Sequence, residues 1–231
     1  MTTQAWPLFD IVLRTPRLEM RAMREADLLA LIDLADRGVH DPDTMPFLHP
    51  WTDTPPPQRH WDSMRFYYRQ WAEWSPDSWH LHFATYADGQ LVGTQGLSAD
   101  GFAQRRVVSS GSWIGKEFQG HGYGKEQRVA VLSLAFDELG AQMAETEAFW
   151  DNGASNTVTR WLRYEPNGEG LVVRRNGTDR VLRYRLTRGR WEERRARGDL
   201  PAVEVEGVKP CLPLFGLTEG EPEPKRRGHR G

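Results

Sequence analysis

The segment Trp113–Lys125 carries the residues whose types and spacing are best suited to chemistry. Three glycines at alternate positions let its backbone adopt positive φ angles and come close to a ligand. Lys125–Leu139, with apolar residues at helical spacing, follows at once. Backbone amides at the start of a helix, with the positive end of its dipole, form an anion site. The segment therefore predicts either a pyrophosphate-binding turn or a glycine-rich connection without a ligand.

Phosphate-binding loops of two other kinds do not fit this segment. A Walker A loop needs Gly-x4-Gly-Lys-Ser/Thr, but Lys125 is followed by Glu126. A dinucleotide fingerprint that began at Gly122 and Gly124 would need a third glycine where the chain has Gln127. Both nucleotide-binding motifs are excluded.

The proline-rich segment His40–Gln58 is the second region with functional side chains. Its prolines rule out a long helix or a central strand, and a loop of this length inside a domain often has a function. Residues 25–62 hold eight acids against Arg37 and Arg59. We therefore expect an acidic, aromatic-lined mouth that suits a cationic amine. The candidate substrate residues in this loop are Asp41, His49 and Trp51.

Five of the ten tryptophans lie between Trp51 and Trp79. We expect Trp51 to face the acceptor, and we expect the others, Trp61, Trp71 and Trp79 among them, to form the core that supports the loop. His80 and His82 share one face of a strand, but no third metal ligand is evident. Paired surface or core histidines are therefore expected, not a metal site.

Hydrophobic periodicity places secondary structure around these segments. Strands are expected over residues 13–23, 79–85, 90–97, 105–114, 142–149, 171–174 and 181–186. Helices are expected over residues 25–35, 60–74, 125–139, 155–162 and 189–198. This order predicts an α+β domain with a mostly antiparallel sheet and helices on its faces.

The composition excludes several classes of protein. The chain has 231 residues, of which 39% are apolar and 27% charged, and a net charge of -2, as expected for a soluble globular protein. No stretch approaches the roughly 20 apolar residues that span a bilayer, and the N-terminus lacks the layout of a signal peptide. Cys211, the single cysteine, can form neither an internal disulfide nor a multi-cysteine zinc site. We therefore expect a cytoplasmic protein, and acids that nearly cancel its arginine-rich end argue against nucleic-acid binding.

Gln119-Gly-His-Gly-Tyr-Gly124 resembles the Arg/Gln-x-x-Gly-x-Gly/Ala pyrophosphate motif of the GNAT superfamily of acyl-CoA-dependent N-acetyltransferases. Three further segments resemble the branch that acetylates the N-termini of ribosomal proteins: its opening strand, its central hairpin, and its Asn-x-x-Ser helix with the closing strand. These segments are Leu13–Arg21, Gly93–Leu97 and Asn152–Tyr164.

The resemblance implies a GNAT-like domain over residues 10–187, with a mixed, mostly antiparallel sheet flanked by helices on both faces. Residues 188–217 are then a C-terminal extension, and residues 218–231 are expected to be a disordered tail.

The resemblance also implies roles for single residues, with acetyl-CoA as co-substrate and no metal. The amides of residues 119–125 would cradle the pyrophosphate, and the backbone at Trp113 and Ile114 would pair with the pantetheine arm and offer an N–H to the thioester carbonyl. Asn152 would bond the pantetheine, and Ser155 would donate to the leaving sulfur. Without the resemblance, Asn152 and Ser155 are ordinary helix N-caps, and Trp113 fits the core equally well. The cofactor-binding candidates are Trp113, Ile114, Gln119, Gly120, His121, Gly122, Tyr123, Gly124, Lys125 and Asn152.

Three positions depart from the family pattern. Ser109 stands where many relatives have glutamate, Thr159 stands near the position of a tyrosine acid, and Arg163 replaces a glycine. An obvious side-chain base is therefore missing. A water chain, a carboxylate such as Glu147, or an amine that arrives partly neutral could fill the role.

Two functions follow from these observations. The first is direct transfer of an acetyl group from acetyl-CoA to a primary amine of a small molecule, peptide or protein. The alternative is a non-catalytic acyl-CoA-binding or interaction module with the same fold, which the missing acid and base would suit. No membrane or nucleic-acid partner is expected, and formation of a homodimer is left open.

Overall fold

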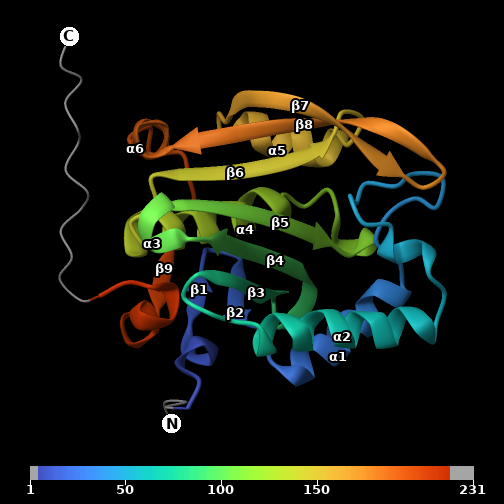
Figure 1. Ribbon diagram of the computed structural model, residues 1–231, viewed down its shortest axis with the longest axis horizontal. Coiled ribbons are helices and arrows are strands. Elements are labelled where there is room, and N and C mark those ends of the chain that lie inside the picture. Colours follow the sequence, from blue (N-terminus) through green and yellow to red (C-terminus); the bar gives the residue numbers. More distant parts are fainter. Residues whose placement is uncertain (1–4, 219–231) are drawn as a thin grey trace.

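Nine strands form one mixed sheet in the computed structural model, which describes residues 5–218 (Figure 1). Their order across the sheet is β7-β8-β6-β5-β4-β3-β2-β1-β9. The strands are β1 (Val12–Arg14), β2 (Leu18–Ala22), β3 (Ser78–Ala87), β4 (Gln90–Asp100), β5 (Val107–Ile114), β6 (Met143–Phe149), β7 (Glu165–Arg174), β8 (Gly177–Thr187) and β9 (Glu204–Glu206). The α-helices are α1 (Glu25–Asp36), α2 (Gln58–Ala72), α3 (Phe102–Arg105), α4 (Tyr123–Ser133), α5 (Gly153–Trp161) and α6 (Arg188–Arg195).

Neighbouring strands of this sheet run antiparallel at every pairing except one. The exception is β5 with β6, which pair in parallel over only three positions, from Val107 with Met143 to Ser109 with Glu145. The predicted α+β fold, a mostly antiparallel sheet with helices on both faces, is confirmed. The short parallel contact at the centre of the sheet is the feature that creates the site described below.

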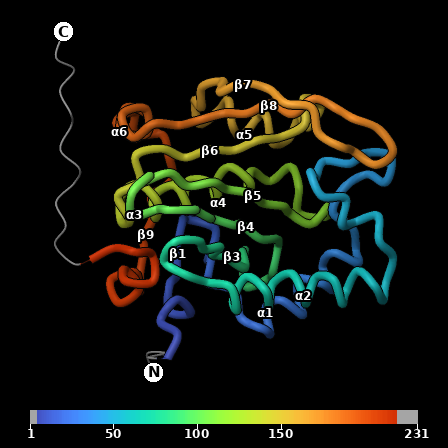
Figure 2. Tube along the Cα trace, in the orientation of Figure 1, coloured from blue at the N-terminus to red at the C-terminus, as the bar shows by residue number. Residues whose placement is uncertain are grey.

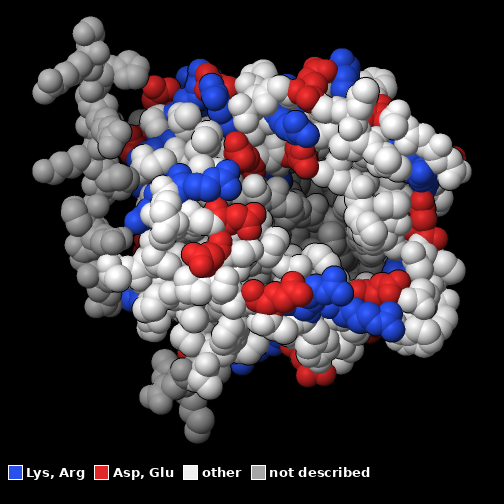
Figure 3. Space-filling view, viewed as in Figure 1, with Lys and Arg blue, Asp and Glu red and all other residues white. Residues whose placement is uncertain are grey.

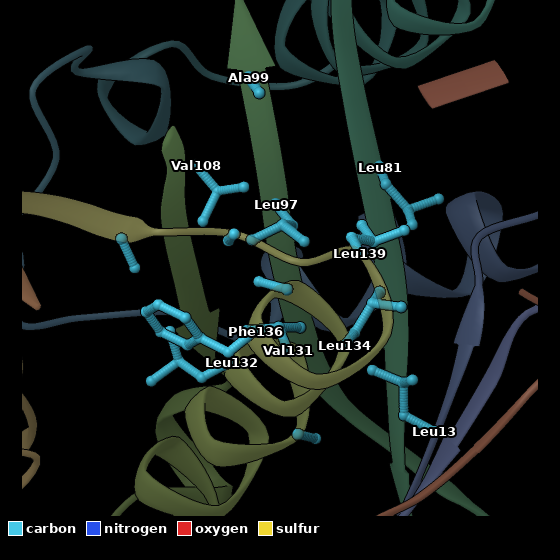
Figure 4. Close-up of a cluster of buried hydrophobic side chains, with 14 of the residues drawn as sticks. Leu13, Leu81, Leu97, Ala99, Val108, Val131, Leu132, Leu134, Phe136 and Leu139 are labelled. Atoms are coloured by element: carbon cyan, nitrogen blue, oxygen red, sulfur yellow. The ribbon is translucent and has the colours of Figure 1, made fainter. Parts of the chain in front are cut away.

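The two faces of the sheet bury different helices because side chains alternate along each strand. On β3, Trp79, Leu81 and Phe83 belong to the main core with helix α4. Figure 4 shows this cluster, in which leucines of β1, β3 and β4 meet apolar residues of α4 and of the turn that follows it. The next residue of β3, Ala84, faces the opposite side and packs with Leu28 of α1 and Tyr67 of α2. Helix α4 therefore covers one face, and α1 and α2 cover the other.

Several predicted elements differ in detail from the structure. The single strand expected over residues 13–23 is two strands, because the chain turns at Thr15–Arg17. The long helix ends earlier than predicted, since a π-helical turn occupies Leu134–Glu138. Trp61 was expected in the core and is 53% exposed, because α2 packs through Met64, Tyr67 and Trp71, one turn further along. Helical spacing predicts a face, but it does not predict where contact along that face begins.

The C-terminal extension packs against the same core as the rest of the chain. Strand β9 pairs with β1 at the edge of the sheet, and Cys211 and Phe215 are fully buried in the main cluster. Burial raises the pKa of the Cys211 thiol to about 11, so this cysteine is an inert core residue. The predicted disordered tail lies outside the described residues from position 219 onward.

A long connection between α1 and α2 reaches the far end of the molecule. Figure 2 shows it rising from the two helices to lie beside the tip of the β7–β8 hairpin. Arg174 in this hairpin donates to the carbonyl of Met45 at 2.7 Å, and Arg175 binds Asp53 at 2.8 Å. The hairpin therefore fixes the proline-rich loop, which was the second functional region predicted from the sequence.

Candidate active site

The strands β5 and β6 separate at the centre of the sheet, leaving one edge of β5 without a partner strand. Their pairing ends at Ser109 and Glu145, although both strands continue. The carbonyl of Ser110 still accepts a hydrogen bond from Thr146 of β6 at 3.3 Å. Backbone groups alternate in direction along a strand, so the N–H and C=O of Ser112 point into the same gap. A gap with free backbone groups can pair with an extended ligand or polarise a carbonyl.

The glycine turn lies at the start of helix α4, on the face of the sheet that this helix covers. Gly120 and Gly122 have φ angles of 81° and 85°, and Gly122 is the residue immediately before the helix. A Cβ at Gly120 would meet nothing within 4 Å, so the space above the turn is open. The amides of Gln119 and Lys125 donate to the carbonyls of Lys116 and Gly122, so the amides between them and the helix dipole are the groups that could hold an anion, and they fit a pyrophosphate.

Side chains of the glycine turn are used to hold the turn in place. Gln119 donates to the carbonyls of Val39 and Ile114 at 2.7 and 2.8 Å. His121 and Tyr123 stack with ring centroids 5.6 Å apart, and the Nζ of Lys125 lies 5.3 Å from the ring centroid of Trp161. The anion site thus consists chiefly of backbone, and its side chains point into supporting contacts.

The buried carboxylate of Glu126 ties this turn to the opening strands, and the sequence analysis missed it. Glu126 lies in the first turn of α4 and accepts hydrogen bonds from the Thr15 hydroxyl at 2.6 Å and from Arg17 Nε at 2.7 Å. Arg17 also donates to the carbonyl of His121 at 2.9 Å. The contact joins positions more than a hundred residues apart, so no local pattern in the sequence could have found it.

Helix α5 lies beside the start of α4. A Cβ at Gly124 would lie 3.9 Å from Val158 of α5. Asn152 is the N-cap of α5 and accepts from the amide of Ser155 at 3.1 Å, while its amide group donates to the carbonyl of Pro46. Ser155 precedes Val158 by one turn and shares its side of the helix. The capping role expected for Asn152 without any family resemblance is present, and its role toward pantetheine stays a prediction.

A cavity of about 430 Å³ lies on the opposite face of the sheet, under the α1–α2 loop. Figure 3 shows the surface hollowed on this face. The cavity reaches Gly111, Ser112 and Trp113 of β5, which is the stretch that lacks a β6 partner. Its aromatic wall consists of Phe47, Trp51, Phe66, Tyr67 and Trp113. The cavity and the glycine turn therefore lie on opposite faces of the sheet and meet at one gap.

The predicted substrate residues divide into two groups. His49 and Trp51 line the cavity, and Trp51 packs against Trp113 with ring centroids 5.8 Å apart. Asp41 instead caps a turn of the exposed loop, accepting from the amide of Asp43. Glu147 lies on β6, outside the cavity, and its carboxylate pairs with Arg183 at 3.3 Å. Neither of these carboxylates borders the cavity, because each is used in a local contact.

The acidic mouth expected from the loop is absent from the described cavity. Burial acts to raise the pKa of Asp36, but the hydrogen bonds and charges of Arg59 and His60 together outweigh it and lower that pKa. A hydrogen bond from Arg175 lowers the pKa of Asp53. Asp62, which does line the cavity, accepts from Gln58 and Arg65. The acids are present but paired, so the wall presented to a ligand is mainly aromatic.

His82 of β3 also lines this cavity, although the sequence analysis treated it as a surface or core residue. Its ring packs against Tyr67 and Phe66 with centroid distances of 4.9 and 5.6 Å. Burial, with a smaller effect from the charge of His80, lowers the pKa of His82 to about 3. The imidazole is therefore neutral at physiological pH. The signal that could have found it is its alternation with Leu81 and Phe83, which places it on the face opposite the main core.

Residues 5–218 contain neither a candidate metal site nor a candidate membrane span. No group of three or more histidine, cysteine, aspartate or glutamate side chains there could hold a metal ion. No helix in the same range is long and apolar enough to cross a membrane.

Comparison with known proteins agrees with this geometry. Residues 17–165 match the family described as the acetyltransferase (GNAT) domain, which is more than half of the chain. The chain belongs to the GNAT acetyltransferase family. It is accordingly an acyl-CoA-dependent acetyltransferase.

Solved structures show the same fold at low sequence identity. RimJ of Mycobacterium smegmatis, solved with a CoA disulfide, superposes on the acetyltransferase with a TM-score of 0.66 at 18% identity, covering 84% of this chain and 97% of the other. A RimL ribosomal L7/L12 alpha-N-protein acetyltransferase, solved with coenzyme A, gives 0.62 at 16% identity, covering 76% and 97%. An acetyl transferase of Salmonella typhimurium that modifies the N-terminal serine of L7/L12 gives 0.61 at 17% identity, covering 77% and 99%.

Proposed function

We propose that this acetyltransferase moves an acetyl group from acetyl-CoA directly to the α-amino group at the N-terminus of a peptide or protein. The observation that carries the proposal is that the cavity ends at Gly111–Trp113, beside the unpaired edge of β5. The glycine turn of α4 would hold the pyrophosphate, and the free N–H of Ser112 or Ile114 would face the thioester oxygen. The acceptor would then approach from the cavity side of the sheet.

The character of the cavity decides between acceptor amines. Its wall is mainly apolar and includes five Phe, Trp and Tyr side chains, and the nearby acids Asp36 and Asp53 are engaged by Arg59, His60 and Arg175. An apolar site disfavours an ammonium and favours the neutral amine. A peptide α-amine has a pKa of about 8, against about 10.4 for lysine, and each unit is worth about 1.4 kcal/mol. Deprotonation at pH 7 therefore costs an α-amine roughly 3 kcal/mol less than a lysine side chain.

Two of the similar solved proteins support this choice. One is called an alpha-N-protein acetyltransferase, and the other is said to modify an N-terminal serine. A polyamine or an aminoglycoside would bring several cationic amines to a wall whose acids are already paired. Acceptors of that class are therefore less suited to the cavity than a peptide N-terminus.

Release of CoA thiol from acetyl-CoA tests the proposal across four acceptors. These are a lysine-free peptide with a free N-terminus, an N-terminally blocked peptide with one lysine, a polyamine and an aminoglycoside. We expect thiol release with the first, and mass spectrometry should locate one acetyl group on its α-nitrogen. Equal rates with the blocked peptide or the polyamine would contradict the α-amine assignment. Absence of release with every amine would favour the non-catalytic alternative.

A matched pair of tryptophan variants connects this activity to the cavity. Trp51 lines the cavity and packs on Trp113, whereas Trp61 is 53% exposed on α2 and does not line it. Trp51→Ala should raise the KM for the peptide about tenfold, since such aromatic contacts contribute about 1 kcal/mol beyond area burial. Trp61→Ala should leave that KM unchanged. The same KM in both variants would place the acceptor elsewhere.

A further inference from the structure

The floor of the cavity contains an unbroken row of three backbone positions across three strands. His82 of β3 is opposite Gly96 of β4, and Gly96 is opposite Gly111 of β5. Adjacent strands lie roughly 4.8 Å apart, so this row leads from the imidazole to the unpaired edge of β5. All three residues line the cavity.

Neither glycine in the row places a side chain between His82 and β5. A Cβ at Gly96 would lie 3.3 Å from Nδ1 of His82, and a Cβ at Gly111 would meet nothing within 4 Å. Neither glycine is among the residues with positive φ, so the backbone conformation does not require glycine at either position. The two glycines instead keep open the space beside the imidazole, directly before the stretch of β5 that faces the gap.

The surroundings of His82 leave Nδ1 as the nitrogen that faces this space. Nε2 is buried without a hydrogen-bond partner, on a ring that packs edge-on against Tyr67 and Phe66. A proton on Nε2 would lie among aromatic rings, where N–H to π contacts are weakly favourable. The lone pair of the neutral ring then lies on Nδ1, above Gly96.

We propose that His82 is the catalytic residue on the acceptor side, with Nδ1 accepting a hydrogen bond from the attacking amine above Gly96 and Gly111. The proposal rests on the proposed acetyl transfer and supplies a hydrogen-bond acceptor and proton relay for the amine, where the sequence shows no obvious side-chain base. The nitrogen lone pair forms the C–N bond, and the C–S bond breaks with its electron pair on sulfur. The proton that the nitrogen loses is received by Nδ1 and ends on the sulfur, directly or through water, so CoA leaves as the free thiol.

The low basicity of His82 determines which form of the amine it can assist. Burial holds its pKa near 3, so nearly every molecule offers a free lone pair at neutral pH. Such a group is a poor acceptor of a proton from an ammonium, but it orients a neutral amine and relays its proton during attack. It therefore suits an amine that enters the apolar cavity uncharged.

Two substitutions of His82 separate catalysis from packing. His82→Phe keeps a ring against Tyr67 and Phe66 but removes both nitrogens. His82→Asn keeps a hydrogen-bond acceptor close to the position of Nδ1. We expect His82→Phe to lower kcat for the peptide about 100-fold with an unchanged Kd for acetyl-CoA, and His82→Asn to recover at least a tenth of the wild-type kcat. A wild-type kcat in His82→Phe would overturn the proposal, as would a loss in His82→Asn equal to that in His82→Phe.

Gly111→Ala provides a test in which His82 is untouched. The added methyl group meets no atom of the protein, so the fold should be retained, but it occupies the space where the amine would lie. We expect kcat with the peptide to fall at least tenfold with unchanged acetyl-CoA affinity. A wild-type kcat in this variant would contradict the placement of the amine, even if His82→Phe proved unstable.

The outcomes of these tests are distinct from those for the proposed function. If the wild-type enzyme acetylates an amine other than the peptide α-amine, the proposed acceptor is wrong, and the three variants are compared on that amine with the same expectations. If the peptide is acetylated and His82→Phe is fully active, the acceptor is right and the role of His82 is wrong.

Discussion

The glycine turn of α4 and the cavity under the α1–α2 loop are the two halves of the proposed site, and they are constructed in different ways. The turn is a single continuous segment, Gln119–Lys125, whose binding groups are backbone amides. The cavity takes its lining from α1, the loop, α2, β3, β4 and β5, and its binding groups are side chains. A site made of backbone depends on the absence of side chains at a few positions. A site made of side chains depends on how distant segments come together.

The largest expected effect tests the glycine turn as an anion site made of backbone amides. Gly124→Val should weaken CoA binding about 100-fold, because a branched side chain in the first turn of α4 displaces the anion from amides worth about 1.5 kcal/mol each. Gly124 does not have a positive φ, and its Cβ would lie an ordinary 3.9 Å from Val158. The variant should therefore fold. Calorimetric titration with CoA measures the change.

Gly189→Val is the matched control for this variant. Gly189 lies in α6, away from the turn, and a Cβ there meets nothing within 4 Å. Its CoA affinity should equal that of the wild type. If Gly124→Val also binds CoA with wild-type affinity, the turn is not the anion site. The contrast between a backbone site and a side-chain site would then be wrong for the turn.

The same contrast explains which parts of the site could be predicted from the sequence. The glycine turn was found because its residues are consecutive and its function needs small residues followed by a helix. Trp51 and His49 were found because the proline-rich loop is itself a local feature. Glu126 was missed because its partners, Thr15 and Arg17, lie in the opening strands.

The second prediction concerns the side-chain region and its dependence on pH. The folded protein keeps His82 neutral with a pKa of about 3, whereas the unfolded chain has the ordinary value of about 6.5. Between these values the unfolded state binds one more proton, so stability falls as the pH falls. The loss from pH 7 to pH 5 should be about 2 kcal/mol smaller in His82→Phe than in the wild type. Denaturant titrations at the two pH values measure this difference.

An equal loss in both proteins would show that His82 is accessible to protons in the folded state. Burial by Tyr67 and Phe66 would then not keep protons from this imidazole, and its assignment as a neutral group in the side-chain region would be wrong. Burial is the larger cause of the lowered pKa of His82, and His80 on the same strand contributes the rest.

Burial was the property of the fold that the sequence predicted least well. The order of strands and helices follows from periodicity, and most element bounds agree within a few residues. The acids of the loop were counted correctly, but their pairing with Arg59 and Arg175 turns an expected acidic mouth into an aromatic one. Ion pairs and cavity linings form between residues that are distant in the sequence and meet only in the folded chain. Composition therefore shows which charged residues are present, but not which of them pair.

The smallest expected effect separates two reasons for a glycine at a given position: a positive φ angle, and the space left by a missing side chain. Arg163, directly after α5, has a φ angle of 64° and is exposed, in a conformation that usually belongs to glycine. Left-handed backbone costs a residue with a Cβ about 1 kcal/mol, and the greater freedom of glycine in the unfolded chain offsets part of the gain. Arg163→Gly should therefore stabilise the protein by about 0.5 kcal/mol, measured by denaturant unfolding, and Arg163→Ala should leave stability nearly unchanged. CoA affinity should not change in either. The fold thus tolerates a side chain at a positive φ for a small cost, so the angle alone does not explain Gly120, where a Cβ would meet nothing within 4 Å. A destabilised Arg163→Gly would mean that the arginine makes a contact worth more than the strain it bears.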